Sequence, residues 1–345
     1  MKNIKNYIKL LSYSILICCI TFPVLLTGCG TTIKDPVSVT GYKLNTYVTI
    51  KSYTTGGHST TKLNQILDEA LSMCDKYEML FSRTHPDSTL YKVNSGETKV
   101  IPAELAELIQ AGIRYGEISD GAFDISIGAV SSLWDFTADT PVIPDSGHIN
   151  TALSSVDYTN IKLTPNSDGT FTIEKPSDMI IDLGAVAKGY IADKLKEFLL
   201  KNNINHALID LGGNILCVGG KTESSNFNVG IKKPFSEKGE TLVTLSLNNV
   251  SAVSSGNYER YFYENDTLYH HILNPKTGYP YDNNLSGVTI ISESSLMGDC
   301  LSTTSFALGL EEGLKLINNT ADVEAMFVTN TGEVHYSDGF NKYIK

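Results

Sequence analysis

The segment MIIDLGAVAKGYIADKLKEFLLK, residues 179–201, contains a change of local structure that decides much of the fold. Residues 179–183 form a short apolar run, which predicts a strand, and residues 188–201 predict a helix. A turn of small residues joins them and places Asp182 at the end of the strand and Lys188 at the start of the helix. Free backbone groups at such a turn can bind a ligand. An ordinary strand-to-helix turn with a surface lysine is the other interpretation.

The segments on either side add further helices and strands of mixed order. β-Branched and aromatic residues alternate over 40–51, which predicts one strand, and turn residues around 166–169 predict a hairpin. The remaining predictions are helices over 62–80, after Pro102 and over about 299–318, and a strand over 206–211. Helices and strands neither alternate strictly nor segregate, which predicts an α+β fold of mixed sheets with flanking helices.

The composition excludes several classes of protein. The chain has 345 residues, of which 19% are charged and 41% hydrophobic, so neither a disordered chain nor a multi-span membrane protein is expected. With 27 basic against 38 acidic residues the formal net charge is −11, which argues against nucleic acid as a partner because phosphate contacts need a basic face. An acidic protein that binds a phosphorylated substrate needs a metal ion or backbone donors to offset the repulsion.

The N-terminus resembles a bacterial export signal that ends in a lipidation site. A basic stretch over 1–9 precedes an apolar stretch over 10–26, and Leu26-Thr27-Gly28-Cys29 has the form of a lipobox. A transmembrane anchor is the alternative, which the lipobox disfavours. The sequence predicts an extracytoplasmic protein, anchored to the bacterial cell membrane by lipid. Its predicted parts are a lipoprotein signal peptide at 1–28, a lipidated Cys29 with a tether at 29–40, and one catalytic domain at 41–345.

Two segments contain side chains suited to chemistry. Asp299 and Thr303 are four residues apart on a predicted helix, so both oxygens face one way, and oxygen ligands suit Mg²⁺. A helix cap at Asp299 is the other interpretation. His271 precedes the turn sequence NPKTG and can present its imidazole to a substrate, although a lone histidine is as often structural. A third segment, DGAFD at 120–124, is a turn that leads into an acid.

Together these segments resemble one family. The sequences IDLGAVAKGYIAD, SSGNYERYF, HHILNPKTGYP and GDCLSTTSFALG occur in this order, and over roughly 42–335 the chain is similar to the ApbE-type FAD:protein FMN transferases. The resemblance implies an α+β fold with FAD in a cleft between two lobes. It also implies an enzyme that cleaves the FAD pyrophosphate, moves FMN onto a Thr or Ser hydroxyl of another exported protein, and releases AMP.

The resemblance also implies roles for particular residues. The metal shell of Mg²⁺ would consist of the Ala185 main-chain oxygen, Asp299 and Thr303, and His271 would be the catalytic base. The implied contacts to FAD are Ala122, Phe123, Asp124, Asp182, Lys188 and Leu273. The chain departs from the family pattern at Leu44, at Asn274 and at Ser302, where family members often have Met, Asp and a further carboxylate.

Two other functions stay open at this point. One is an Mg²⁺-dependent FAD pyrophosphatase, in which water replaces the acceptor hydroxyl and the products are FMN and AMP. The other is a lipoprotein that binds FAD without reacting. A pure binder would not need Asp299, Thr303 and His271 together, which favours the transferase. The acceptor cannot be named, but no acceptor-like motif occurs in the chain itself, so the partner is expected to be a separate exported FMN-binding protein.

Overall fold

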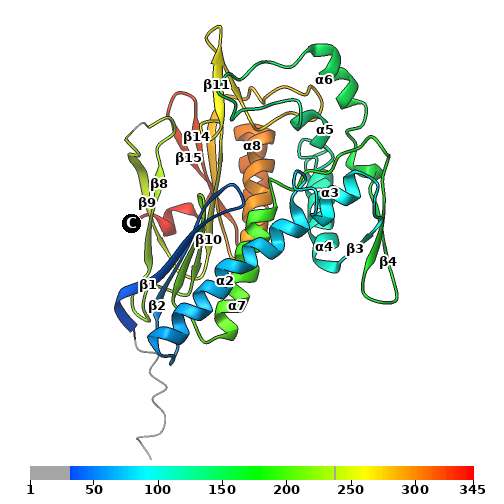
Figure 1. Ribbon diagram of the computed structural model, residues 1–345. Helices are drawn as coiled ribbons and strands as arrows, with labels where there is room; N and C mark the ends of the chain where they lie inside the picture. Colours follow the sequence, from blue (N-terminus) through cyan, green and yellow to red (C-terminus); the bar gives the residue numbers. More distant parts are fainter. Residues whose placement is uncertain (1–31, 237) are drawn as a thin grey trace, which may run out of the picture.

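The computed structural model describes residues 32–236 and 238–345, and its centre is an eight-stranded antiparallel sheet (Figure 1). The spatial order is β1-β2-β6-β7-β10-β13-β14-β15. The strands are β1 (Thr32–Lys43), β2 (Thr46–Thr54), β6 (Ala207–Leu211), β7 (Asn214–Val218), β10 (Ser251–Gly256), β13 (Leu285–Ser292), β14 (Glu324–Thr329) and β15 (Val334–Tyr336). All eight residues of β13 are buried, because this central strand is covered on both faces.

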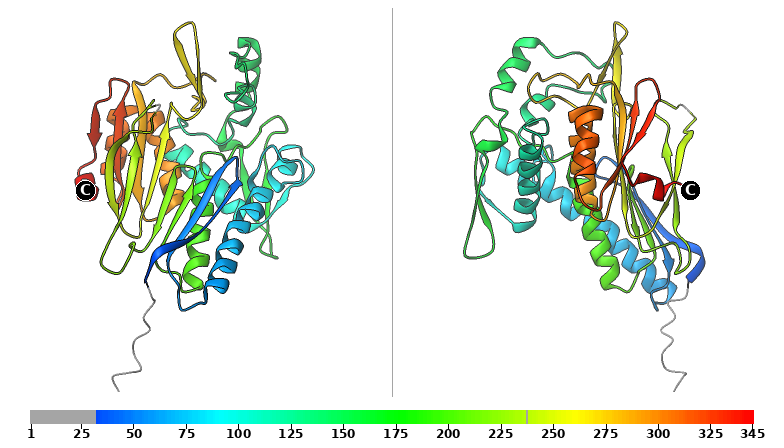
Figure 2. Two further views of the ribbon diagram at one scale, coloured as in Figure 1. Left: turned by 60° about the vertical axis from the view of Figure 1, so that its left-hand side comes forward. Right: turned by 180° about the vertical axis from the view of Figure 1, so that it is seen from behind.

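Three long helices cover one face of this sheet and a hairpin covers the other (Figures 1 and 2). The helices are α2 (Thr60–Phe81), α7 (Ala187–Lys201) and α8 (Ser295–Asn318), which bury apolar side chains against the sheet. The hairpin consists of β8 (Phe227–Lys232) and β9 (Thr241–Leu247), and it forms a second apolar cluster with Cys217, Met326 and Phe340. The two layers keep water away from the central strands.

A second group of elements lies beyond the three helices, on the side away from the large sheet (Figure 2). It contains α3 (Thr89–Asn94), α4 (Ala103–Ile118), α5 (Gly128–Ser131), α6 (Ser146–Leu153), η1 (Tyr158–Asn160) and a small sheet of β3 (Val100–Ile101), β5 (Phe171–Glu174) and β4 (Lys162–Pro165). A separate hairpin of β11 (Tyr261–Glu264) and β12 (Thr267–His270) projects from the molecule, and η2 (Phe340–Tyr343) lies near the C-terminus. The fold is therefore α+β with flanking helices, as predicted, and its sheets in the described residues are antiparallel.

The predicted helices and turns are mostly confirmed. The predictions over 62–80, after Pro102 and over 188–201 correspond to α2, α4 and α7. The helix predicted from Asp299 begins four residues earlier, because the side chain of Ser294 accepts a hydrogen bond from the Met297 amide and caps α8. Asp299 is therefore not the N-cap of its own helix, α8.

Two predicted strands differ from the structure. The single strand predicted over 40–51 is a hairpin, in which Leu44 and Asn45 form the turn between β1 and β2 with φ of 54° and 57°. The strand predicted over 179–183 is reduced to one parallel bridge between Ile127 and Ile180. Its backbone is held by a side chain instead, since the Asn94 amide bonds both the N–H and the C=O of Ile181 at 2.9 Å.

The tether predicted for 29–40 is wrong from Thr32 onward, where the chain forms β1. This strand pairs with β2, and its register runs without a shift from Val37 opposite Ser52 to Lys43 opposite Thr46. An edge strand of this kind depends on the backbone groups of its neighbour, which its own side-chain pattern does not reveal.

The predicted signal peptide and Cys29 lie outside the described residues. Within the part of the chain that the structure describes, every helix is too short or too polar to cross a bilayer.

Candidate active site

The buried carboxylate of Asp299 is the centre of the site. Asp299 lies on α8, with 4% of its surface exposed. Its Oδ2 accepts a hydrogen bond of 2.5 Å from the Gly189 amide, in the first turn of α7, and its Oδ1 accepts one of 2.8 Å from Asn214 Nδ2. A carboxylate at a helix N-terminus is stabilised by unpaired amide groups and by the helix dipole.

The electrostatics of Asp299 combine opposing effects. Burial raises the pKa of Asp299 to about 6, while the positive charge of Lys188 and the hydrogen bonds from Gly189 and Asn214 act in the other direction. A buried anion of this kind favours any cation that can reach it. The half-buried Lys188 lies one residue before Gly189, in the first turn of α7 as predicted, whereas Asp182 pairs with Arg83.

The two helices that meet here cap each other. Asp193 on α7 accepts hydrogen bonds from the Ser295 amide, the Leu296 amide and the Ser294 hydroxyl at 2.8, 3.0 and 2.8 Å, at the start of α8. Asp299 on α8 in turn accepts from the start of α7. The helices approach so closely that a Cβ on Gly189 would lie 2.2 Å from the Ser295 carbonyl oxygen. This reciprocal arrangement fixes the position of Asp299.

The other two predicted metal ligands lie in suitable surroundings. The Gly189 amide donates to Asp299, and α7 begins at Ala187, so the Ala185 carbonyl is not used in the first helical turn. Thr303 lies one helical turn after Asp299 on α8, is half-buried, and its hydroxyl is 3.2 Å from the Ser255 hydroxyl. Ser302 faces Ser255 as well, at 2.8 Å, and also bonds the Asp299 carbonyl, so it stabilises the helix locally.

The three predicted metal ligands all offer oxygen atoms, and one of them, Asp299, is a carboxylate. In the described ranges, no three His, Cys, Asp or Glu side chains cluster as a metal site, so zinc-type ligation has no support there. A carbonyl, a hydroxyl and one carboxylate suit a hard cation such as Mg²⁺, which keeps several waters or phosphate oxygens as further ligands. The residues present therefore fit the predicted Mg²⁺.

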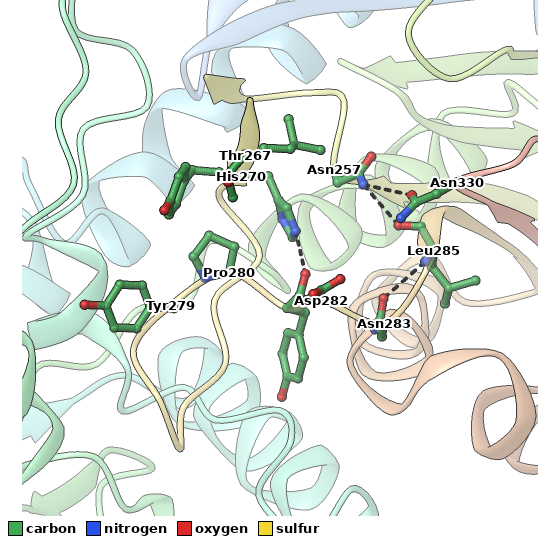
Figure 3. A pocket seen from close by; sticks show the side chains of 12 residues that line it. Asn257, Thr267, His270, Tyr279, Pro280, Asp282, Asn283, Leu285 and Asn330 are labelled. Atoms are coloured by element: carbon green, nitrogen blue, oxygen red, sulfur yellow. Dashed lines mark hydrogen bonds between the residues drawn. The ribbon is translucent and has the colours of Figure 1, made fainter. Parts of the chain in front are cut away.

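His271 and His270 are adjacent but occupy different environments. His270 is buried, and its Nε2 hydrogen-bonds to the Tyr281 carbonyl at 2.9 Å, in a pocket also lined by Asn257 and Asp282 (Figure 3). His271 is exposed and is not among the residues that line this pocket. The two imidazoles thus differ in their surroundings, since His270 is buried and His271 is exposed.

Surrounding protein and nearby cations keep His271 neutral. Desolvation by the surrounding protein, together with the positive charges of Arg260 and Lys188, lowers the pKa of His271 below its usual range. Because the side chain is exposed, the two cations give the firmer reason for this direction. A neutral imidazole at pH 7 can accept a proton. The positive charge of Lys188 acts on both His271 and Asp299, so it lies within electrostatic range of both groups.

Asp182 has partners that the sequence did not reveal. Its Oδ2 accepts hydrogen bonds from Arg83 Nε at 2.8 Å and from the Ser131 hydroxyl at 2.9 Å, and its Oδ1 accepts one from the Gly184 amide. Arg83 also donates to Ser132, so it joins the end of α2 to α5. The structure therefore places a partly buried arginine beside the acid predicted to contact FAD.

The remaining predicted FAD contacts lie on the second group of elements. Phe123 and Asp124 are buried, and both carboxylate oxygens of Asp124 have partners in Ser126 and Tyr158. Burial raises the pKa of Asp124. The Ala122 carbonyl accepts a hydrogen bond of 2.7 Å from the Tyr281 hydroxyl, which ties this turn to the segment after His271.

The turn after His271 is preserved despite Asn274. The Asn274 side chain accepts from the Lys276 amide at 2.8 Å, and its carbonyl accepts from the Gly278 amide at 2.8 Å. Asparagine forms this turn as readily as aspartate does. Leu273 is buried in an apolar cluster with Val130, Trp134 and Ile149, so its contact to FAD stays a prediction.

Three residues that bond the site or its helices were not predicted from the sequence: Arg83, Asp193 and Asn214. Arg83 and Asn214 contact the predicted Asp182 and Asp299, and Asp193 contacts the start of α8. Each contact joins elements distant in the chain, and such contacts have no local pattern. The clearest available signal was the turn Gly212-Gly213, which precedes Asn214 and marks the end of a strand near a possible ligand.

Fold and site together define an α+β protein in which a buried carboxylate, Asp299, meets the start of α7 next to Lys188, and in which Arg83 pairs with Asp182. The chain belongs to the ApbE family, whose model matches residues 44–327.

Its relatives and structural neighbours agree with that assignment. A protein of Klebsiella pneumoniae named FAD:protein FMN transferase is 34% identical over 275 residues, which cover 77% of this chain and 84% of the relative. One of the same name from Treponema pallidum is 31% identical, with 81% of each chain covered. The crystal structure of the ApbE protein of Thermotoga maritima matches with a TM-score of 0.79 at 27% identity, over 90% of this chain and 100% of that one. The flavin transferase ApbE of Vibrio cholerae shares the fold, with a TM-score of 0.77 at 21% identity over 90% and 99% of the two chains.

Proposed function

We propose that this chain is a FAD:protein FMN transferase, which moves FMN from FAD onto a Thr or Ser hydroxyl of an exported acceptor protein and releases AMP. The observation that carries the proposal is the contact between Asp299 and the start of α7, where the charge of Lys188 acts on both Asp299 and His271. Such a place suits a pyrophosphate and a reacting hydroxyl. The names of the relatives support the same activity.

Mg²⁺ would be held by the Asp299 carboxylate, the Thr303 hydroxyl and the Ala185 carbonyl. These groups come from α8 and from the turn before α7, which the contact between Gly189 and Asp299 joins. When bound, Mg²⁺ would neutralise charge on the pyrophosphate and polarise it. Lys188 adds a positive charge on the same side, which an acidic protein needs in order to bind a phosphorylated substrate.

His271 would act as the base. The acceptor hydroxyl is a poor nucleophile until its proton is removed, and the neutral imidazole can remove it. The hydroxyl oxygen then forms a bond to the phosphorus of the FMN half, the pyrophosphate bond breaks, and AMP leaves with the bonding electrons. The proton ends on His271. The negative charge of bound FAD would raise the pKa of His271 toward neutrality, where a base works best.

Arg83 and Asp182 would hold the flavin side of the substrate. The ion pair between them fixes the Asp182 carboxylate at the edge of α5, next to the Ser131 hydroxyl. Polar groups held rigidly in this manner can select the flavin by hydrogen bonds without changing shape when it binds. Ala122, Phe123, Asp124 and Leu273 are expected to contribute to the same part of the site.

The location of the protein is also a proposal. Lipidation at Cys29 would anchor the chain to the outer side of the bacterial cell membrane, and β1 begins only three positions later, at Thr32. The β11–β12 hairpin, next to His271, lies at the opposite end of the molecule from the start of β1 (Figures 1 and 2). This arrangement would direct the site away from the membrane and toward an acceptor.

Incubation with FAD, Mg²⁺ and an exported FMN-binding domain that contains the acceptor Thr or Ser tests the proposal. Flavin fluorescence on the acceptor band in a denaturing gel is the expected result, with one AMP released per label. Free FMN and AMP without a labelled acceptor would identify a pyrophosphatase instead. Unchanged FAD would identify a binding protein.

A further inference from the structure

We propose that Asn214 is a positioning residue, which holds the Asp299 carboxylate in the orientation that binds the divalent cation. The inference rests on the proposed function, because it assumes a cation at Asp299. Asn214 is the first residue of β7, and 1% of its surface is exposed. It contacts no substrate in this proposal and acts only through Asp299.

Both ends of the Asn214 amide are used, which fixes its orientation. The Ser295 hydroxyl donates to Asn214 Oδ1 at 2.7 Å, and Asn214 Nδ2 donates to Asp299 Oδ1 at 2.8 Å. The reverse orientation would turn the amide oxygen toward a carboxylate that only accepts. A hydroxyl, an amide and a carboxylate thus form one directed line of hydrogen bonds, in which each bond strengthens the next.

The line leaves the carboxylate no freedom to rotate. Asp299 Oδ1 is held from β7 by Asn214, and Oδ2 is held from α7 by the Gly189 amide. These two bonds fix the plane of the carboxylate and therefore the directions of its remaining lone pairs, which a cation would use. A cation site whose ligands are already oriented loses less conformational entropy on binding.

The backbone around Asn214 is suited to a fixed contact. Gly212 and Gly213 adopt φ of 66° and 96°, in the left-handed region, and turn the chain from β6 into β7 immediately before Asn214. Asn214 then pairs with Val253 of β10 in the large sheet. The side chain therefore projects from a rigid strand end.

Replacement of a hydrogen-bond partner of a metal ligand typically weakens metal affinity by about 10–100-fold. Asn214→Leu has nearly the same size and removes both hydrogen bonds. Asn257→Leu is the matched control, because Asn257 is 3% exposed and its amide donates to the Leu285 carbonyl rather than to Asp299. Both variants lose a buried amide, so both are expected to be less stable than the wild type.

The experiment is a titration of each protein with Mn²⁺, which oxygen ligands accept in place of Mg²⁺. The concentration of free Mn²⁺ is measured at each step from its electron paramagnetic resonance signal, and the dissociation constant is obtained from it. FAD affinity without metal is measured alongside. Asn214→Leu is expected to bind Mn²⁺ about 10–100-fold more weakly, with FAD affinity little changed, while Asn257→Leu binds Mn²⁺ as the wild type does. Ser295→Ala, which removes only the hydroxyl that orients Asn214, is expected to show a smaller loss.

The outcomes separate this inference from the proposed function. Wild-type affinity for Mn²⁺ in Asn214→Leu would overturn the role of Asn214 and leave the metal site intact. An equal loss in Asn257→Leu would show a general effect of lost stability and would also overturn it. If Asn214→Leu does not fold, unchanged Mn²⁺ affinity in Ser295→Ala is the overturning result. A wild-type protein that binds no Mn²⁺ would refute the metal assignment itself.

Discussion

Two adjacent histidines show how position decides chemistry at the residue scale. His270 is buried and donates to the Tyr281 carbonyl, whereas His271 is exposed and its amide bonds the Arg260 carbonyl. His271→Ala should reduce FMN transfer by about 10²–10⁴-fold while FAD affinity stays near normal, because a general base contributes mainly to the rate. Single-turnover transfer and FAD binding by fluorescence measure the two effects separately.

His270→Leu serves as the comparison for that variant. It removes a buried hydrogen bond and should lower stability, but it should leave the rate of transfer within a few-fold of the wild type in the folded protein. A similar loss of rate in both variants, or a loss in His271→Ala explained by weaker FAD binding, would count against a base at position 271.

The pH dependence of the reaction follows from the surroundings of His271. The pKa of His271 is lowered by surrounding protein and by Arg260 and Lys188, so the free enzyme needs a more acidic solution than usual to protonate it. The acid limb of the kcat/KM profile should therefore have its midpoint below the ordinary histidine value of about 6.5. In Arg260→Gln one of these charges is absent, and the midpoint should move upward. An unchanged midpoint in Arg260→Gln would exclude His271 as the group that titrates.

Asp299 can be tested with a substitution that keeps its shape. Asp299→Asn should abolish the response of transfer to Mg²⁺, because it removes the only carboxylate from the predicted metal ligands. FAD should still bind, though more weakly, through contacts on the other elements. Asp75→Asn is the comparison, since Asp75 is an exposed carboxylate paired with Lys43 and should not affect the Mg²⁺ requirement. An unchanged Mg²⁺ dependence in Asp299→Asn would remove this residue from the metal shell.

At the scale of elements, the site depends on the contact between α7 and α8. A Cβ at position 189 would lie 2.2 Å from the Ser295 carbonyl oxygen, so Gly189→Ala must push the helices apart and lengthen the bond to Asp299. The free energy of unfolding should fall by about 1–3 kcal/mol, and transfer should require more Mg²⁺. Chemical denaturation and an Mg²⁺ titration of activity measure these effects.

Gly184→Ala is the matched substitution in the same segment. A Cβ there meets only the Asp182 side chain, at 3.1 Å, and Gly184 is exposed, so stability should change much less. Equal stability of the two variants would contradict the close packing of α7 against α8.

At the scale of the whole molecule, the proposed attachment to the membrane would depend on Cys29, which lies outside the described part of the chain. Cys29→Ser should yield a protein without lipid that is released from the membrane, because the other membrane-binding segment, the apolar stretch at 10–26, is expected to be a removable signal. Cell fractionation and mass spectrometry of the N-terminus measure this. Cys19→Ser, within the predicted signal peptide, should leave the protein anchored. Retention of Cys29→Ser through an uncleaved apolar stretch would show that the lipobox prediction is wrong.

The sequence by itself determined the α+β class, the helices α2, α4 and α7, and the predicted roles of Asp299, Lys188 and His271. These depend on local signals, since periodicity, turn residues and ordered motifs are properties of neighbouring residues. Only the tertiary structure decided that 40–51 is a hairpin and that the backbone of Ile181 is hydrogen-bonded by the Asn94 side chain and not by a neighbouring strand. It alone also decided which residues bond the predicted site and the helices around it, namely Arg83, Asp193 and Asn214. The physical reason is that a backbone or side-chain hydrogen bond needs a partner from another element. Which element comes within 3 Å is settled by packing of the whole chain.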